Sequence, residues 1–537
     1  MSPIVREYYR VPREDRASYI RPAPVDLAAL VEGNRRLIAS YDFRLAGRPF
    51  AEFRAAARAE IVATAGRYAA RWGFAVPAWA EPAPLIVTGH QPPPFHPGVW
   101  IKNFLAGSLA SAVGGAALNL IVDNDEARGQ VLRFPTRAAG PGQEGGEARL
   151  AEVRLVDGAA GVPLEDQPAA VLRREAADEC RPLLAPESAG ALARFWALLE
   201  AAVPGAASAG ETLSVARRRL EEALSLRNLE LPVSRLADSE AFRLFVAEML
   251  GRPEAFFAAY NESLAEYRRA YRERSPAQPV PDLGRDGPRL ELPLWIWRAG
   301  QGRRRLWVEP QPGGDLALRA GGDPAGLVRA SEIGDAAATA ARLAALRQDG
   351  WKIRPRALAL TFFVRLVLGD VFVHGLGGAL YDKVTDAMIE RLLGVRPPGL
   401  ILASCTVHLP LETYPSTPAD LVAARRALRD WRFNPDRMLS AEVRARPEAA
   451  AMVEEKRRLV AGRAADAQER RRAFHRVHEI NGGLAGLHPD GPRGAEQRLA
   501  TVRRHVRLNA ILRNREYPFC IYPVEELARF YREAVSA

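Results

Sequence analysis

The chain has 537 residues, of which 48% are hydrophobic, and it carries 75 Lys and Arg against 64 Asp and Glu, a formal net charge of +11. This length exceeds one compact core and the apolar fraction excludes global disorder, so we expect several folded domains. No apolar run approaches the roughly 20 residues of a membrane-spanning helix, and the opening residues Met1–Arg6 do not resemble a signal peptide, so we expect a cytoplasmic protein without a membrane partner.

The basic excess is not gathered into a run of like charges along the sequence. Arginines occur in every region beside acidic residues, a pattern typical of GC-rich coding, and we therefore expect no nucleic-acid partner. Only four lysines occur, and Lys102, which follows a histidine-bearing turn, is a weak pointer to a site that needs a compact ammonium. The cysteines form no Cys-x-x-Cys pair, which argues against a disulfide framework and against a zinc ribbon.

Residues 1–83 are predicted to form an N-terminal helical layer, because apolar residues recur there at helical spacing. Residues 84–128 follow with a short apolar strand at 84–87, a helix at 99–113 and a second strand at 118–122. A strand, a helix and a strand in this order form a βαβ unit with parallel strands. We interpret this segment as the first half of an α/β core.

A large insertion of mixed helices and strands is predicted over 129–350. Its expected elements are helices at 191–202, 211–226, 239–250 and 253–274, and a β-meander at 290–298 and 304–309. The α/β pattern resumes over 351–415, which we interpret as the second half of the core. This half is predicted to contain a strand at 370–373, a glycine loop at 374–378, a helix at 379–393 and a strand at 400–403.

Residues 416–516 are predicted to form a C-terminal helical hairpin. Apolar residues recur there at heptad spacing, namely Val453, Val460, Ala467 and Phe474. This spacing is typical of a coiled-coil arm, and we expect the arm to mediate a homodimer. Residues 517–537 are predicted to pack back on the core. The elements together predict an α/β protein with a parallel sheet, a mixed α+β insertion and a helical arm.

Candidate chemistry is concentrated in the strand-to-helix turn Thr88–Lys102. His90 and His96 can hold an anion or transfer a proton near neutral pH, although each could instead cap the turn or pack on the sheet. Lys102 lies one turn into the helix, where it can reach an anion at the helix N-terminus or face solvent. We predict that these three residues are catalytic.

Polar residues follow the other predicted strands as well. Asp123 and Asp125 end the second strand, and alternate strand residues share a face, so we predict that this catalytic pair orients an amine, a ribose or a metal ion; the alternative is a capping turn. His374 precedes glycines whose N–H groups can approach a phosphate closely. All these strand ends are expected at one edge of the sheet. The predicted binding residues are Thr88, Gly89, Gln91, Gly98, His374, Gly375, Gly377, Gly378, Tyr381 and Ser404.

Other kinds of site find less support in the sequence. No metal ion is predicted, because the histidines and acidic residues lack the spacing of a helical zinc site. A serine or cysteine nucleophile is not expected, since no Gly-x-Ser-x-Gly motif occurs and Cys405 has no evident base partner. The glycines at 375–378 are not a full dinucleotide fingerprint, and an ADP- or ATP-like nucleotide is the one cofactor that they leave open.

Three stretches, in this order, resemble the bacillithiol-biosynthesis cysteine-adding enzyme family. Thr88-Gly89-His90-Gln91 with Pro97-Gly98 resembles that family's Thr-Gly-Gln-Gln turn and Gly-Pro helix start. Asp123-Asn124-Asp125 resembles its Glu-Asp-His-Asp run. The third stretch is similar to a Ser-Pro-rooted helix, a Gly-Pro-Gly-Glu loop and a tyrosine-bearing helix, here Arg354-Pro355, Gly375–Gly378 and Tyr381. A helical arm follows in both.

This chain has His90 where the family has Gln, and Gly378 where the family has Glu. The opening turn is also similar to that of WbqC-like proteins, which have His-Gln-Pro, a Pro/Gly turn and a lysine. In addition, His96-Pro97-Gly98-Val99 is similar to the His-x-Gly-His turn of nucleotidyltransferases and class I aminoacyl-tRNA synthetases, without its last histidine.

The family resemblance implies a Rossmann-like core and a ligase- or transferase-type reaction on small-molecule substrates. A cysteine-like amino acid or another amine would be joined to an anionic or nucleotide-like acceptor. His90, His96 and Lys102 would hold the acceptor's charge and transfer protons, while Asp123 and Asp125 would orient the donor amine. The alternative is a non-catalytic ligand-binding or scaffold protein that keeps the enzyme-like fold.

Overall fold

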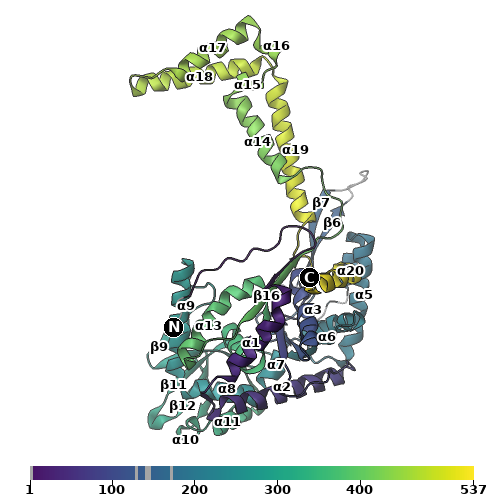
Figure 1. The fold of residues 1–537 in the computed structure, drawn as a ribbon, viewed down its shortest axis with the longest axis vertical. Helices are drawn as coiled ribbons and strands as arrows, with labels where there is room; N and C mark the ends of the chain where they lie inside the picture. Colours follow the sequence, from purple (N-terminus) through teal and green to yellow (C-terminus); the bar gives the residue numbers. More distant parts are fainter. Residues whose placement is uncertain (1–3, 127–130, 139–146, 170–172, 174, 537) are drawn as a thin grey trace. The chain divides into compact units, whose positions relative to one another are not determined.

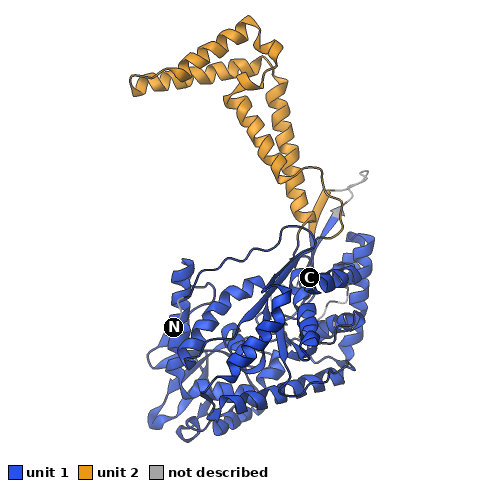
Figure 2. Cartoon of the chain, viewed as in Figure 1, with its two compact units in different colours: residues 1–136, 151–408, 515–537 blue, residues 137–150, 409–514 orange. Residues whose placement is uncertain are grey.

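The structure is a computed structural model that describes residues 4–126, 131–138, 147–169, 173 and 175–536. The chain forms two compact units, coloured separately in Figure 2. Unit 1 comprises Met1–Thr136, Ala151–His408 and Arg515–Ala537, and unit 2 comprises Arg137–Leu150 and Leu409–Asn514. Unit 1 contains the sheet that positions the predicted site residues.

The central sheet of unit 1 has the strand order β1-β16-β15-β4-β5-β8 (Figure 1). The strands are β1 (Ala17–Arg21), β4 (Leu85–His90), β5 (Ala116–Ile121), β8 (Leu229–Pro232), β15 (Val371–His374) and β16 (Leu400–Thr406). Every neighbouring pair is parallel except β1 with β16, which is antiparallel. The expected α/β class with a parallel sheet is therefore confirmed.

The direction in which the sheet grows reverses between β4 and β15. From β4 the chain continues to β5 and β8 on one side, and it later adds β15 and β16 on the other side. Such a switch point is where open parallel sheets bind their ligands, beyond the carboxyl ends of the strands. Thr88 ties the two strands together here, because its hydroxyl donates a 3.0 Å hydrogen bond to the Val373 carbonyl.

Helices follow the strands at this edge as the sequence predicts. Helix α3 (Pro97–Ala112) starts with a proline at its first position, where the missing N–H costs no hydrogen bond. Helix α13 (Leu376–Leu393) follows β15. Helix α20 (Val524–Ser536) contacts α3, and the Tyr531 hydroxyl donates to the Pro97 carbonyl at 3.0 Å.

Two strands of the central sheet were not expected. The edge strand β1 lies in the segment 1–83, which is otherwise helical with α1 (Leu27–Ala39) and α2 (Phe50–Arg71). Strand β8 has only four residues and lies between helices. Both strands are too short for an alternating pattern to stand out, and the tertiary pairing of the backbone decides their conformation.

The insertion contains a second, antiparallel sheet with the order β13-β12-β11-β10-β14. Its strands are β10 (Arg289–Arg298), β11 (Arg304–Pro310), β12 (Leu316–Ala320), β13 (Asp323–Val328) and β14 (Trp351–Pro355), with the short β9 (Arg285–Asp286) paired to β10. The predicted meander is confirmed. Apolar residues of both sheets belong to one continuous core, for example Val87, Leu118, Leu294 and Leu318.

The four helices expected in the insertion are also confirmed. They are α5 (Pro186–Ala202), α6 (Ala209–Ala223), α8 (Glu240–Gly251) and α9 (Pro253–Tyr271). The shorter helices of unit 1 are α4 (Ala176–Cys180), α7 (Val233–Ala237), α10 (Ala330–Ile333), α11 (Ala336–Gln348) and α12 (Ala357–Phe363), and α12 continues into a π-helical turn, Val364–Leu368. Strands β6 (Val131–Ala138) and β7 (Glu147–Arg154) pair with each other, as β2 (Arg44–Leu45) and β3 (Arg48–Pro49) do.

No helix among the described residues is long and apolar enough to cross a membrane.

Unit 2 is built from two pairs of helices rather than from one hairpin (Figure 1). Helix α14 (Pro418–Phe433) packs on α19 (Asp490–Leu512), and α17 (Pro447–Ala461) packs on α18 (Ala467–Gly486), with the short α15 (Pro435–Met438) and α16 (Ala441–Arg444) between. Of the heptad residues, Val460 and Phe474 are 68% and 61% exposed, so they do not form the core of this unit. The coiled-coil contact and the homodimer stay predictions.

Unit 2 also carries most of the net charge. Its segment 409–514 contains 21 Lys and Arg against 13 Asp and Glu, an excess of 8 within the +11 of the whole chain. The excess is spread over the segment and forms no long run of like charges, because acidic residues occur beside the arginines there as well. The expected absence of a nucleic-acid partner therefore stays a prediction.

A buried ion-pair cluster joins α2 to the start of β15. The Asp370 carboxylate, 2% exposed, accepts hydrogen bonds from Arg54 at 2.9 Å, from Arg58 at 3.0 Å and from the Leu85 N–H at 2.7 Å. Removing one partner of such a cluster leaves a buried charge uncompensated, which is far more costly than losing an exposed pair.

We therefore expect Asp370→Ala to lower the free energy of unfolding by about 3–5 kcal/mol, because Arg54 and Arg58 lose their buried counter-charge. Denaturant titration monitored by tryptophan fluorescence measures this change. The exposed Asp42→Ala is the control and should change stability by less than about 0.5 kcal/mol. Equal effects of the two substitutions would contradict the assigned role of Asp370.

Candidate functional site

The carboxyl ends of the parallel strands bring most of the predicted site residues to one edge of the sheet. His90 ends β4, His374 ends β15, and Ser404 lies near the end of β16. Asp123 follows β5 by two residues. His90 and His374 lie on the two strands that flank the switch point.

Lys102 is the buried cation of this edge. Its side chain reaches back from α3 to the preceding turn, and its ammonium donates a 2.7 Å hydrogen bond to the Gly89 carbonyl. The residue is only 5% exposed, and this burial lowers the pKa of Lys102 to about 8. An ammonium has three N–H donors. Two of them therefore remain for a ligand, because Gly89 provides the single protein acceptor found for Lys102 among the described residues.

His90 presents an unprotonated nitrogen. Its Nδ1 lies 3.1 Å from the Gln91 carbonyl oxygen, and because a carbonyl only accepts, Nδ1 carries the proton of the neutral ring. The lone pair is then on Nε2, which is buried and makes no hydrogen bond of standard geometry among the described residues; the Asn103 side chain interacts with the ring and favours its protonation. Burial lowers the pKa of His90 well below its usual range, and Arg217 and Lys102 lower it further. Phe95 holds the ring in place, with the ring centres 4.1 Å apart.

His96 lies at the N-terminus of α3 beside Arg515 of the C-terminal segment. Burial, with the charges of Arg515 and Lys102, lowers the pKa of His96 to about 4. Its Nδ1 is also buried and has no partner among the described residues. The Arg515 guanidinium donates to the Ser404 hydroxyl at 2.9 Å and to the Cys405 carbonyl at 2.6 Å.

Gly98 makes this arrangement of Arg515 possible. A Cβ atom on Gly98 would lie 2.2 Å from an Arg515 nitrogen and 2.5 Å from the Cys405 carbonyl oxygen. Only glycine lets the first turn of α3 approach β16 and Arg515 this closely. The predicted binding residue Gly98 is therefore needed to admit a guanidinium that sequence reasoning did not find.

His374 ends β15 and lies two residues before α13. Burial, with the charges of Lys102 and Arg365, lowers the pKa of His374 to about 3. Its Nε2 is 3.7 Å from the Asp382 carboxylate. The expected glycine loop is shorter than predicted, since α13 begins at Leu376 and places Gly377 and Gly378 in its first turn. A Cβ on Gly378 would lie 1.7 Å from the His374 ring, so the ring fills the space where other residues carry a side chain.

These contacts determine which side chains at the carboxyl edge of the sheet are charged at neutral pH. The three histidines are neutral, because their pKa values are lowered to about 4 at His96, to about 3 at His374 and well below the usual range at His90. Lys102 and Arg515 provide positive charge. A negatively charged ligand would offset the unfavourable free energy of burying the Lys102 charge. The neutral imidazoles could then accept protons from that ligand.

The two aspartates do not share a face as predicted. Asp123 accepts from the Ser234 N–H at 2.9 Å and from the Ser234 hydroxyl, so it caps α7. Asp125 accepts from Gln91 and forms a 2.8 Å ion pair with Arg303. Strand β5 ends at Ile121, and beyond that residue the alternation of a strand no longer applies. Asp123 thus contacts the N-terminal turn of a helix that is distant in sequence rather than the segment that follows β5.

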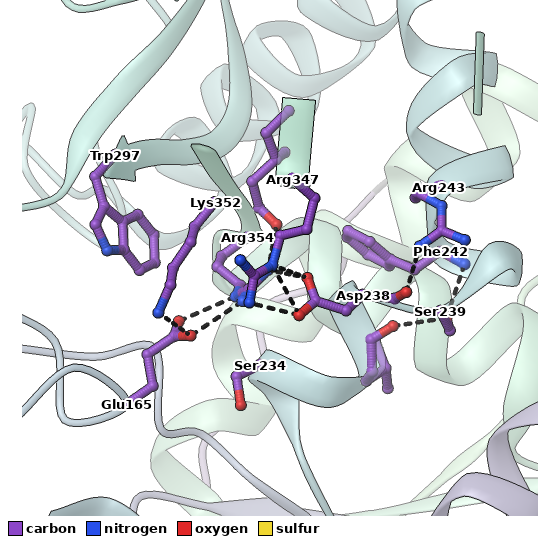
Figure 3. A network of polar contacts seen from close by, with 12 residues as sticks. Glu165, Ser234, Asp238, Ser239, Phe242, Arg243, Trp297, Arg347, Lys352 and Arg354 are labelled. Atoms are coloured by element: carbon purple, nitrogen blue, oxygen red, sulfur yellow. Dashed lines mark hydrogen bonds and ion pairs between the residues drawn. The ribbon is translucent and has the colours of Figure 1, made fainter. Parts of the chain in front are cut away.

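Charged residues next to Asp123 form a network whose partners are all matched (Figure 3). The Arg354 guanidinium lies between Glu165 at 3.0 Å and Asp238 at 2.8 Å, and Lys352 pairs with Glu165 at 3.2 Å. Burial, together with the charge of Glu165, raises the pKa of Asp123. Because each charge has its counter-charge, this network needs no ligand and is best explained as the polar contact between the two sheets.

The remaining predicted residues have structural contacts or lie at the surface. Thr88 joins β4 to β15, Gly89 provides the acceptor for Lys102, and Tyr381 is 36% exposed on α13. Gly375 is the residue before α13, and a Cβ on it or on Gly377 would meet no atom within 4 Å. No group of three or more His, Cys, Asp or Glu suited to a metal ion occurs among the described residues.

A cavity of about 550 Å³ lies elsewhere, at the amino ends of β5 and β8. Gly115, Asn228 and Arg532 are among the residues that line it. This edge of a parallel sheet is not where such folds bind ligands, and the histidines lie at the opposite edge.

No family model matches this chain, and no curated protein matches it either.

We expect Gly378→Ala to displace the His374 ring into solvent, because the added methyl group would occupy its position. The pKa of His374 should then rise from about 3 toward the ordinary 6.5, as NMR titration of the ring proton would measure. Gly377→Ala adds the same methyl group where nothing lies within 4 Å, and it should leave the His374 titration unchanged. Identical titrations in both variants would contradict the packing of His374 on Gly378.

We also expect Lys102→Gln to raise the pKa of all three histidines, since the Lys102 charge lowers each of them. In contrast, Arg515→Gln should raise the pKa of His96 but leave the pKa of His374 unchanged. The reason is that, of these two histidines, the Arg515 charge lowers the pKa of His96 alone. Histidine NMR titrations of both variants check this pattern. A Lys102→Gln protein with unchanged histidine titrations would show that Lys102 does not lie among them.

Proposed function

We propose that this protein is an enzyme whose Rossmann-like core joins an amino-acid or amine donor to an anionic or nucleotide-like acceptor. The observation that carries the proposal is the Lys102 ammonium, buried at the switch point with two free donors and with three neutral histidines around it. Buried groups with strongly shifted pKa values at a ligand-binding edge are typical of active sites.

In this proposal the acceptor's anionic group binds between Lys102, Arg515 and the N–H groups at the start of α13. The ammonium of Lys102 and the guanidinium of Arg515 supply the charge. Gly377 has no side chain to keep a ligand away from the N-terminus of α13, where helix N–H groups favour an anion.

His90 and His96 serve in proton transfer. Joining an amine to an acceptor requires that the donor's ammonium lose a proton before its nitrogen can attack. The His90 Nε2 carries the lone pair for this step, because its Nδ1–H is held by the Gln91 carbonyl. His96 is unprotonated at neutral pH, with its pKa lowered to about 4, and it becomes an effective second proton acceptor once the acceptor's anionic group offsets the charges of Arg515 and Lys102 that help to lower this pKa.

The aspartates have a smaller part in this proposal than the sequence suggested. Asp123 is engaged by Ser234, and Asp125 by Gln91 and Arg303. We therefore assign them to holding the turn after β5, with Asp125 fixing Gln91 beside His90. Three further parts of the proposal rest on the sequence: a relation to the bacillithiol-biosynthesis cysteine-adding enzymes rests on the resemblance, a homodimer on the helical arm, and an ADP- or ATP-like ligand on the glycine turn.

A thermal-shift screen with ADP, ATP, cysteine and sugar malates tests the proposal. We expect at least one anionic acceptor to raise the melting temperature, and we expect Lys102→Met to abolish that shift. In a turnover assay with cysteine and the stabilising acceptor, His90→Ala or His96→Ala should lower the rate by about 100-fold or more, as for the loss of a general base.

The control for these variants is His475→Ala, which changes a histidine of α18 in unit 2 and should leave both the shift and the rate unaltered. If no compound shifts the melting temperature, the donor–acceptor proposal fails. If ligands bind but the histidine variants and the wild type behave alike, a non-catalytic ligand-binding or scaffold protein is the better account.

A further inference from the structure

An exposed group of aromatic rings lies in unit 2, where α14 contacts α18 (Figure 1). Phe433 ends α14 and is 40% exposed, and Phe474 of α18 is 61% exposed. The half-buried His478 joins them, because its ring centre lies 5.9 Å from that of Phe433 and 4.8 Å from that of Phe474. The three rings form one continuous surface, which we call the aromatic patch.

The aromatic patch is held on a fixed scaffold. The Phe433 carbonyl accepts hydrogen bonds from the Lys456 ammonium at 3.0 Å and from the Asn481 amide at 3.1 Å, and both donors are buried. Other residues of the same two helices, Trp431 and Ile480, are buried in the hydrophobic core of unit 2. The helices therefore pack through those residues and leave the rings of the patch at the surface.

Two arginines of α18 flank the aromatic patch. Arg470 and Arg471 lie one helical turn before Phe474, so they are exposed on the same face of the helix. Neither forms an ion pair with a carboxylate among the described residues. Glu469, the nearest carboxylate in sequence, accepts instead from the Ala465 N–H at 2.6 Å. The two guanidinium groups are thus available to an anion.

Two arginines of α14 lie beside the patch as well. Arg429 is exposed one turn before Phe433, and the Arg432 guanidinium lies over the Phe433 ring, 5.4 Å from its centre. Neither has a carboxylate partner in the described part of unit 2. The surface therefore combines exposed aromatic rings with cations that no acidic residue neutralises.

We propose that this surface binds single-stranded RNA. Unpaired bases stack on exposed aromatic side chains, and arginines hold the phosphates that connect the bases. A duplex cannot use the rings in this way, because the faces of its bases are stacked on one another. RNA is the favoured nucleic acid, since its loops and ends offer unpaired bases, whereas cellular DNA is mostly paired.

The charges favour this partner over two other occupants. A second copy of the chain on the same surface would bring the unpaired arginines of both copies together, and like charges repel. A helix that lies on an anionic membrane separates its apolar face from its cationic face, whereas on α18 Phe474 shares a face with Arg470 and Arg471.

The surface also explains why the sequence predicts no nucleic-acid partner. It is assembled from α14 and α18, which are separated along the chain by three other helices, α15 to α17. The order of charges in the sequence therefore does not show it. The inference is independent of the reaction proposed for unit 1, because it uses none of the same residues.

Fluorescence anisotropy of the full-length protein tests the proposal with a labelled single-stranded RNA of about 12 nucleotides, within the range of known single-strand sites. We expect this RNA to bind, and we expect the RNA duplex of the same length to bind about fivefold more weakly or less tightly still, because its bases cannot stack on the rings. An absence of binding, or equal binding of the duplex, would overturn the inference.

Variants separate stacking from charge. Phe474→Ala should weaken binding about fivefold or more and leave its salt dependence unchanged, because a stacking contact is lost and no charge. Arg470→Gln should lower the slope of log K against log salt by about 0.7, the value for one phosphate contact of a single strand. Both residues are exposed, so both proteins should fold.

The controls are matched residues of unit 1. Tyr8→Ala removes an aromatic ring that is 69% exposed and lies beneath the Arg6 guanidinium, and Arg10→Gln removes an exposed arginine. Both should bind RNA as the wild type does. If Phe474→Ala also binds as the wild type does, the rings do not stack on bases and the inference is overturned.

Further measurements test the other occupants. A dimer that dissociates in Phe474→Ala, as light scattering would show, together with unchanged RNA binding would place a second copy on this surface. Phe474-dependent binding to phosphatidylserine vesicles without RNA binding would place a membrane there. Either result overturns the inference. After ultraviolet cross-linking in cells that express the chain, ribonuclease should remove the attached nucleic acid, and removal by deoxyribonuclease instead would contradict the choice of RNA.

Discussion

The burial of one ammonium group, that of Lys102, is the constraint on which the candidate site depends. Placing a charge in a protein interior is unfavourable unless it is paired, and Lys102 has a carbonyl rather than a carboxylate as its partner. Its charge in turn disfavours protonation of His90, His96 and His374. The same group thus attracts anions and keeps the neighbouring imidazoles unprotonated at neutral pH.

The rest of the local structure serves this arrangement. Helix α3 starts at Pro97 and packs on β4, so Lys102 can reach back to Gly89. The glycines at 98 and 378 admit Arg515 and the His374 ring where any side chain would collide. Glycine at these two positions lets Arg515 donate to Ser404 and Cys405, and it lets the His374 ring pack on the first turn of α13.

A comparison of two polar clusters supports this distinction. In the network of Figure 3, Arg354 and Lys352 are matched by Glu165 and Asp238, so the cluster is complete as it stands. At the switch point, by contrast, the nitrogens His90 Nε2 and His96 Nδ1 are buried and make no hydrogen bond of standard geometry in the described residues. A strongly shifted pKa alone would not separate the two, since Asp123 beside the first network is shifted as well.

Much of this site could be predicted from the sequence, because its main parts are local. The strand-to-helix turn, the position of Lys102 after it and the strand that ends at His374 all follow from short-range patterns. Arg515 could not be predicted, since its partner Ser404 is 111 residues away and no local signal accompanies it. The contacts of Asp123 could not be predicted, because the strand ends two residues before it and its partner Ser234 lies 111 residues further along the chain. The short strands β1 and β8 were missed because sheet pairing, not sequence pattern, determines them.

The most direct test of the account is the proton balance of anion binding. Sulfate does not titrate near neutral pH, so any proton taken up from the buffer when sulfate binds must be bound by the protein. With the pKa of Lys102 at about 8, calorimetry at pH 8 in two buffers of different ionisation enthalpy should show uptake of roughly half a proton per sulfate bound. Lys102→Met should abolish both the binding and the uptake. Sulfate that binds without proton uptake, or that binds equally well to Lys102→Met, would contradict the central role of this buried ammonium.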